Sequence, residues 1–232
     1  MRNKMINLFS VMLLLLMLAT QAFAHFPVIV KGDRLLIKDP EISRAFYDRL
    51  TGSPHTYLIE SPKNFDLYIN LLVPKSSNPN GRYSANVYRL KDNQRLLIGK
   101  LDQNAVEWTE FYEPFAGDSY LKGPEFKMQV AAGSYEIEVF STQNQGKYAL
   151  AVGEVEAFGL NKNTLKTLLI LPRLKTEFFN VSALSLLRSR MGIAYVVFLA
   201  LLILLIFIVW KLTRAMVKRL KKTHRHLERT GG

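Results

Sequence analysis

The sequence predicts a mainly β protein: an antiparallel β-sandwich or jelly-roll domain outside the cytoplasm, an amphipathic connector and one C-terminal transmembrane helix. Three observations lead to this prediction. Short segments between residues 26 and 158 alternate apolar and polar side chains, which is the period of a half-buried strand. Residues 1–24 have the layout of a secretory signal peptide. Residues 191–210 form an apolar run without a charged residue, and about 20 such residues span a bilayer as a helix.

The N-terminal segment 1–24 combines the three features of a cleavable signal peptide. Arg2 and Lys4 provide a positive start, the run Leu8–Ala19 provides a short apolar core, and Ala22 and Ala24 are small residues at the −3 and −1 positions of a cleavage site. The apolar run is shorter than the roughly 20 residues that a membrane span needs. We therefore expect the mature chain to begin at residue 25.

Residues 25–160 are predicted to form the extracytoplasmic β-sandwich domain. The clearest strand is Tyr135–Phe140, in which apolar and acidic residues alternate strictly. Turn residues separate about nine such segments, a spacing typical of sandwiches and jelly rolls. Lys31–Asp33 is predicted to be a tight hairpin connection. The segment 41–50 is expected to be a short helix, because its apolar residues have helical spacing after Asp39–Pro40.

Residues 161–190 are predicted to be a basic amphipathic connector. Leucines and phenylalanines form apolar faces, lysines and arginines form basic ones, and Pro172 is expected to break or kink the helix. Two interpretations stay open for this segment. It lies in the membrane interface, as basic amphipathic helices do, or it packs on the β domain as a C-terminal strap.

The run 191–210 is the predicted membrane span, and residues 211–232 are the predicted cytoplasmic tail. The tail holds eight basic residues against Glu228 alone, and we expect the helix to continue into it. Basic residues beside a span stay on the cytoplasmic side and attract anionic lipids. The basic residues expected to flank the anchor on this side are Lys211, Arg214, Lys218, Arg219, Lys221 and Lys222. Together with the signal peptide, they predict an outer N-terminus and an inner C-terminus.

Charge and cysteine content exclude two classes of protein. The net charge of +12 comes from the segments flanking the membrane, while residues 25–160 carry 15 basic and 17 acidic residues. The outer domain is therefore not expected to bind nucleic acid. The chain has no cysteine, so this domain must fold without disulfides. A bacterial cell membrane fits these features, with a eukaryotic secretory membrane as the alternative.

Two segments carry a resemblance to known families. Phe126–Val139 followed by Gln145–Val152 resembles the last hairpin of bacterial pre-peptidase C-terminal β-sandwich domains, with its Gly-x-Tyr strands. The order of segments is similar to that of the p24 membrane proteins with a GOLD domain, although the paired cysteines and the sorting signals of that family are missing here. The resemblance implies a binding or assembly role and no catalytic residues.

Two sets of side chains are candidate sites in the outer domain. One is an aromatic surface for a ligand or protein partner, with core packing as the alternative, and its residues are Trp108, Phe111, Tyr112, Phe115 and Tyr120. The other is a copper site, in which the new N-terminus at His25 and the imidazole of His55 would bind one ion. No other cofactor is expected.

Catalytic motifs are not found in this sequence. It contains no nucleophile elbow, phosphate-binding loop, zinc-hydrolase helix or dinucleotide fingerprint. We therefore expect a protein that is not an enzyme, that contacts membrane lipids, and that binds a protein partner in the membrane or in the outer compartment.

Overall fold

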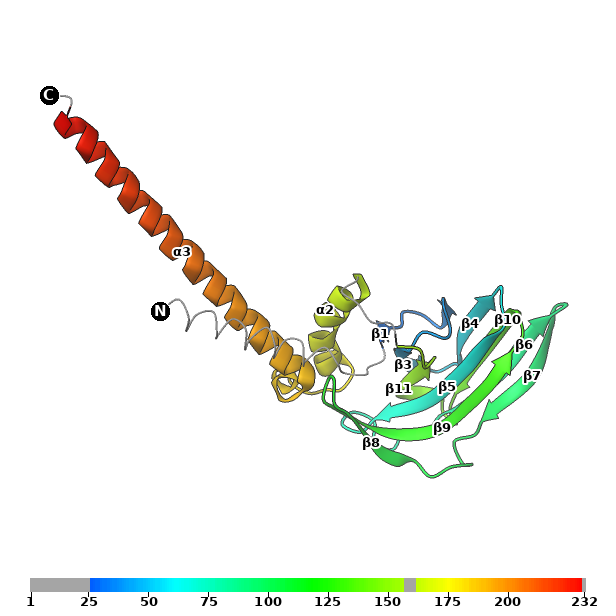
Figure 1. The fold of residues 1–232 in the computed structure, drawn as a ribbon. Helices are drawn as coiled ribbons and strands as arrows, with labels where there is room; N and C mark the ends of the chain where they lie inside the picture. Colours follow the sequence, from blue (N-terminus) through cyan, green and yellow to red (C-terminus); the bar gives the residue numbers. More distant parts are fainter. Residues whose placement is uncertain (1–25, 157–161, 231–232) are drawn as a thin grey trace. The chain divides into compact units, whose positions relative to one another are not determined.

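The computed structural model describes residues 26–156 and 162–230. The chain divides into two compact units, one spanning Ala22–Arg190 and the other containing the long C-terminal helix. The first unit is mainly β and contains two curled sheets (Figure 1). The prediction of a mainly β domain is thereby confirmed.

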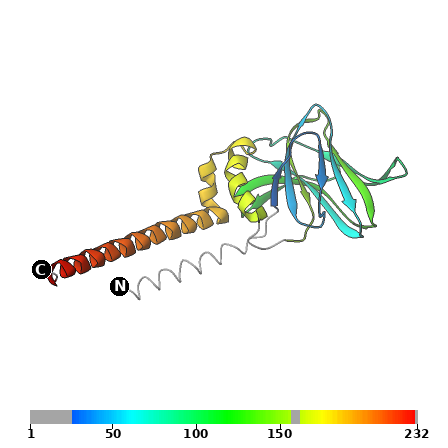
Figure 2. The ribbon, with the colours of Figure 1, turned by 90° about the horizontal axis from the view of Figure 1, so that it is seen from above.

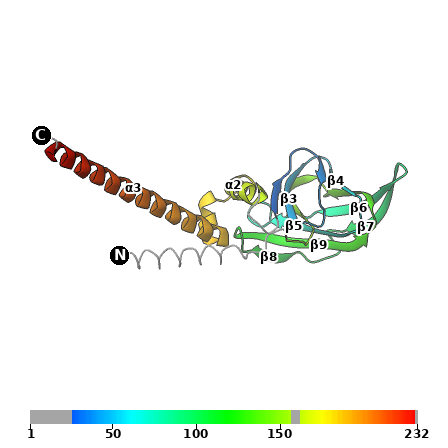
Figure 3. The ribbon, with the colours of Figure 1, turned by 45° about the horizontal axis from the view of Figure 1, so that its top comes forward.

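Each sheet is formed from strands that are distant in sequence. The first sheet contains, in spatial order, β1 (Phe26–Ile29), β3 (Arg44–Thr51), β11 (Gln145–Val152), β5 (Phe65–Pro74), β9 (Asp118–Val130) and β8 (Thr109–Glu113). The second contains β2 (Arg34–Ile37), β4 (His55–Ser61), β10 (Gly133–Phe140), β6 (Ser84–Lys91) and β7 (Gln94–Leu101). Figures 2 and 3 show the same strands from two other directions.

The two sheets share one hydrophobic core. Alternation along β10 buries Tyr135, Ile137 and Val139, whereas Glu136 and Glu138 point outward to Arg95. Apolar residues of the first sheet meet this face, and they include Phe46, Leu50, Leu67, Ile69, Leu71, Tyr148 and Leu150. Burial of this apolar surface is the main term that stabilises the domain.

The pairing of the first strands departs from the prediction of a purely antiparallel domain. β1 pairs with β3 in parallel, and β2 pairs with β4 in parallel. The predicted hairpin at Lys31–Asp33 is therefore wrong, because β1 and β2 belong to different sheets. The chain crosses from the first sheet to the second between β1 and β2, at Gly32 (φ +85°), and again between β3 and β4, at Gly52 (φ +115°). A glycine with positive φ allows each crossing to be tight.

The predicted jelly-roll strand order is not confirmed by these sheets.

The predicted helix at 41–50 is also wrong, since Arg44–Thr51 is strand β3. Both faces of this strand are covered. Phe46 and Leu50 face the core, while Tyr47 packs edge-on against Phe178, with ring centroids 4.9 Å apart. A strand buried on both faces loses its period of two, and the remaining apolar pattern imitates helical spacing.

The connector contains α2 (Lys162–Glu177) and the short 3₁₀ helix η1 (Ala183–Arg188). Pro172 lies inside α2 without ending it. Leu171, Leu174 and Phe178 are buried, and α2 lies beside β1 (Figure 1). Two interpretations were left open above, an interfacial helix and a C-terminal strap. The C-terminal half of α2, which carries Leu171 and Leu174, packs on the β domain as a strap does.

The second unit contains α3 (Arg190–Thr230), which is 41 residues long. Its part from Arg190 to Lys218 is long and apolar enough to cross a membrane. The predicted span 191–210 falls inside this part, and the helix continues into the basic tail as expected. The exposed apolar side chains along it include Phe198, Leu202 and Ile206.

Candidate functional site

The five predicted aromatic residues lie in three different environments. Tyr120 is buried, and its hydroxyl lies 2.9 Å from that of Tyr47. Trp108 packs on the core and donates its indole N–H to the Gln103 carbonyl at 3.0 Å. Only Phe111 and Tyr112, on β8, are exposed, while Phe115 is half-buried. The structure therefore does not bring the five rings to one surface.

A buried polar network lies where the chain crosses between the sheets. Asp48, on β3, accepts hydrogen bonds on its Oδ2 from His55 Nδ1 at 2.8 Å, from the Tyr57 hydroxyl at 2.6 Å and from the Tyr148 hydroxyl at 2.8 Å. Its Oδ1 accepts the Arg49 backbone N–H at 2.7 Å. The carboxylate thus joins both sheets, because Tyr148 belongs to the first and Tyr57 to the second.

The protonation of this network follows from its geometry. Burial raises the pKa of Tyr57 and of Tyr148 well above the usual value, and the nearby Asp48 carboxylate adds to the effect, so both hydroxyls stay neutral donors. His55 must also donate from Nδ1, because its partner is a carboxylate. Its Nε2 has no hydrogen-bond partner among residues 26–156 and 162–230, and His55 lines a groove.

This groove has a volume of about 670 Å³ and is open to solvent. The crossing at 30–33 and the β3–β4 crossing form two of its walls, and the end of α2 forms the third. Apolar and charged side chains both line it, among them Ile29, Tyr47, Phe178, Asp33, Arg49 and His55. The size is within the range of pockets that hold a small molecule or a few residues of a partner.

Lys147, on β11, attaches the α2 wall of the groove to the sheet. Its Nζ donates to the carbonyls of Glu177 and Phe178 and to Asn180 Oδ1, each at 2.8 Å. These carbonyls belong to the C-terminal end of α2, where free acceptors and the negative end of the helix dipole favour a cation. Burial lowers the pKa of Lys147, and the charge of Arg49 lowers it further.

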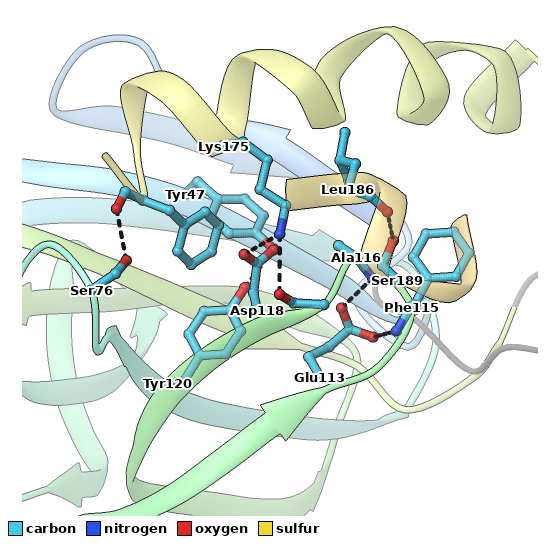
Figure 4. Close-up of polar contacts among 12 residues, drawn as sticks. Tyr47, Ser76, Glu113, Phe115, Ala116, Asp118, Tyr120, Lys175, Leu186 and Ser189 are labelled. Carbon is cyan, nitrogen blue, oxygen red and sulfur yellow. Dashed lines mark hydrogen bonds and ion pairs between the residues drawn. The ribbon is translucent and has the colours of Figure 1, made fainter. Parts of the chain in front are cut away.

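A second buried cation holds α2 from its other side (Figure 4). Lys175 has only 1% of its side chain exposed, and its Nζ lies 2.5 Å from Asp118 Oδ1 and 3.2 Å from the Gly117 carbonyl. The lysine descends from α2 beside the Tyr47 and Tyr120 rings toward the start of β9 (Figure 4). This pair is structural, since both side chains are buried, Lys175 to 1% and Asp118 to 6% exposure.

Glu113 completes the polar cluster below α2. Its carboxylate accepts the backbone N–H groups of Phe115 at 2.6 Å and Ala116 at 2.8 Å, which shapes the β8–β9 turn. Burial raises the pKa of Glu113 and of Asp118. The backbone bonds oppose this shift at Glu113, and the Lys175 ammonium opposes it at Asp118.

The predicted copper site is described in part. His25 lies outside the described residues, whereas His55 is buried and lines the groove. The parallel register places Phe26 beside Arg44, and the His55 partner Asp48 lies four residues further along β3. Four residues of strand span about 13 Å. The described part of the chain contains no cluster of three or more His, Cys, Asp or Glu suited to a metal.

Three buried charged residues were missed by sequence reasoning: Asp48 and Lys147, which line the groove, and Lys175, which holds α2. A signal existed for Asp48, because strand alternation places it on the same face as Phe46 and Leu50. The incorrect helix prediction for 41–50 hid this pattern. The two lysines carried no such signal, since their burial depends on a contact between α2 and strands that are distant in sequence.

Comparison with known proteins finds no matching family model and no matching curated protein. The pre-peptidase C-terminal domain of a Bacillus anthracis collagenase aligns at 12% identity with a TM-score of 0.31, over 57% of this chain and 98% of that domain. A surface-associated copper-binding protein of Methylomicrobium album BG8 aligns at 9% identity with a TM-score of 0.27, over 55% and 100% of the two chains. A Paenibacillus barengoltzii β-glucosidase aligns at 9% with a TM-score of 0.25, over 56% and 13%.

The resemblance to pre-peptidase C-terminal domains is thus found again in the structure, at low identity and over part of the chain. All three similarities are too low to transfer a function.

The Lys175–Asp118 pair yields a prediction for stability. Lys175→Met leaves the Asp118 carboxylate buried without its cation, and we expect a loss of about 3–5 kcal/mol in the free energy of unfolding near neutral pH. Arg173→Met is the matched control, because Arg173 pairs with Glu177 on the exposed face of the same helix and such pairs contribute about 0–1 kcal/mol. Denaturation of both variants in detergent measures the difference.

The deficit of Lys175→Met should shrink in acid. The folded-state pKa of Asp118 is already raised by burial, and removing the ammonium raises it further. Stability from such a group is present below the unfolded pKa and is lost as pH rises through the folded pKa. A deficit that is equal for the two variants, or that is independent of pH, would contradict the structural role of the pair.

Proposed function

We propose that this protein is a membrane-tethered, extracytoplasmic binding or assembly protein, in which a β-sandwich holds a ligand or a protein partner in the groove beside His55. One observation carries the proposal. A groove of about 670 Å³ lies over a polar network whose imidazole Nε2 has no partner in the described chain. Buried polar atoms that face an open groove are available for a ligand to bind.

The proposed location follows from the sequence and from α3. We propose cleavage of a signal peptide at 1–24, a single type I span within Arg190–Lys218 and a basic cytoplasmic tail. The excess of Lys and Arg after the span supports an inner C-terminus. A bacterial cell membrane with a periplasmic domain is the proposed setting, and a eukaryotic secretory membrane is the alternative. The proposed partners are anionic lipids at the tail and a protein or ligand at the groove.

The groove supports binding better than catalysis. Asp48 orients His55 as in a catalytic dyad, but among the described residues no hydroxyl or other nucleophile is hydrogen-bonded to Nε2. A nucleophilic mechanism needs the nucleophile within hydrogen-bonding reach of the base. We therefore propose no catalytic step.

Copper binding is the alternative function, and one observation favours it. Metal-binding histidines usually donate their second ring N–H to a carboxylate, which fixes the ring and the tautomer. His55 donates to Asp48 in this way. In this alternative, the mature N-terminal amine and imidazole of His25 supply the other ligands.

Photo-crosslinking tests the groove. A benzoylphenylalanine at Ser53, which is exposed on the groove wall, should form a discrete adduct whose mass identifies a ligand or a protein. The same group at Gln129, exposed on β9 and outside the groove, should not. Adding Thr51→Trp fills the groove and should reduce the Ser53 adduct about tenfold, the effect of losing about 1.4 kcal/mol. Identical adducts from both positions would sink the proposal.

The absence of cysteine makes orientation measurable with single labels. Lys31→Cys in the outer domain should react with a membrane-impermeant maleimide in intact spheroplasts. Lys218→Cys, exposed near the end of the apolar part of α3, should react only after permeabilisation. The reverse pattern would show that the orientation is wrong.

Copper titration of the purified mature protein tests the alternative. If it holds, Cu²⁺ binds below micromolar concentration, and both His25→Ala and His55→Gln abolish that binding. His224→Ala in the tail is the control and should have no effect. Binding that is absent, or that survives His25→Ala, would rule the copper site out.

A further inference from the structure

Two exposed leucines stand side by side in η1. A 3₁₀ helix has three residues per turn, so residues i and i+3 lie on the same side. Leu184 and Leu187 have this spacing and are 72% and 52% exposed, whereas Leu186 points inward and is buried. Side chains of this size, exposed as a pair on one side of a turn, indicate a contact surface.

The fold prevents these leucines from turning inward. Ser182 caps the start of η1 by accepting the Leu184 N–H at 3.3 Å, and the Ser189 hydroxyl donates to the Leu186 carbonyl at 2.6 Å. The Arg190 N–H donates to the Pro114 carbonyl in the β8–β9 turn at 3.2 Å. Figure 4 shows Leu186 and Ser189 beside Phe115 and Ala116 of that turn. The two local bonds hold the shape of η1, and the Arg190 bond ties its C-terminal end to the β8–β9 turn.

Tyr112 and Arg188 extend the same end of the domain. A Cβ on Gly117 would lie 2.9 Å from the Ser189 Cβ and 3.4 Å from the Tyr112 hydroxyl, so the ring of Tyr112 ends close to η1. Tyr112 as a whole residue is 56% exposed. Arg188 is exposed in the last turn of η1. Leucine, tyrosine and arginine are the residues that lipid interfaces accept: apolar tips, amphipathic rings and cations for phosphate.

Chain length places these residues near the membrane whatever direction α3 takes. The apolar part of α3 begins at Arg190, three residues after Leu187, and three residues reach at most about 11 Å. The headgroup layer of one leaflet is about 5–8 Å thick. A span that begins near Arg190 therefore keeps Leu187 within about 11 Å of the hydrocarbon boundary, in the headgroup layer or just outside it.

We propose that Tyr112, Leu184, Leu187 and Arg188, here called the leucine surface, insert into the headgroup region of the outer leaflet. The occupant of this surface is then lipid, with the leucines at the acyl boundary and Arg188 at phosphate. The proposal rests on the membrane anchor proposed above. It assigns contact with the membrane interface to η1 and β8, whereas the C-terminal half of α2 packs on the two-sheet domain.

Nitroxide labels on single cysteines test the proposal in the intact chain, which has no cysteine of its own. Leu184→Cys and Leu187→Cys are labelled in phosphatidylcholine nanodiscs. Leu96→Cys on β7 is the matched control, because Leu96 is 62% exposed in the same unit. Leu202→Cys on α3 reports the anchor itself. The measurement is the ratio of collisions with oxygen, which enters lipid, to collisions with a water-soluble nickel chelate.

We expect this ratio to be several-fold higher at 184 and 187 than at 96, and highest at 202. A water-like ratio at 184 and 187 with a lipid-like ratio at 202 overturns the proposal and leaves the anchor standing. Labels at 184 and 187 that are shielded from both reagents also overturn it, because protein then covers the surface. A water-like ratio at 202 overturns the anchor and this proposal together.

Discussion

The buried contact between Lys175 and Asp118 is the interaction on which the arrangement of α2 against the two-sheet domain depends. Removing two charged groups from water costs free energy of folding. The close approach of the two groups, at 2.5 Å, and the Gly117 carbonyl, which accepts a further hydrogen bond from Lys175, offset this cost. The pair fixes α2 against the start of β9. Lys147 holds the C-terminal end of the same helix through two carbonyls and Asn180. Together the two lysines hold α2 against the two-sheet domain at two places.

The groove is a consequence of the same anchoring. Two of its walls are the β1–β2 and β3–β4 connections, where the chain crosses from one sheet to the other. The two connections lie side by side, beside Asp48, because β1 pairs with β3 in parallel and β2 pairs with β4 in parallel. The third wall is the end of α2, which Lys147 and the buried Phe178 hold against the first sheet. A carboxylate that accepts hydrogen bonds from His55, Tyr57 and Tyr148 joins the sheets and also fixes the orientation of the imidazole. The contacts that stabilise the domain here are therefore the same contacts that shape the groove.

The proposed functions place two surfaces on one small domain. The groove would hold the ligand or partner, and the leucine surface would rest on lipid. Both are bounded by the connector, since α2 closes the groove and η1 carries the leucines. A partner bound in the groove would contact the end of α2 directly.

The sequence by itself determined the elements whose signal is local. Alternation in β10, the long apolar run of α3, and the change of composition near residue 160 follow from side chains that are neighbours along the chain. Only the tertiary structure decided the rest. Asp48 and Lys175 are buried and paired because of contacts with residues 7 to 100 positions away in sequence, and Tyr120 became core because Tyr47 and Phe179 cover it. The segment 41–50 became a strand because both of its faces are buried, a condition that no periodicity in the segment records. The pattern of apolar and polar residues along a segment shows only which face of that segment is shielded from water. A crossing between sheets, a packed connector helix and a buried ion pair depend on which distant parts of the chain pack against that face.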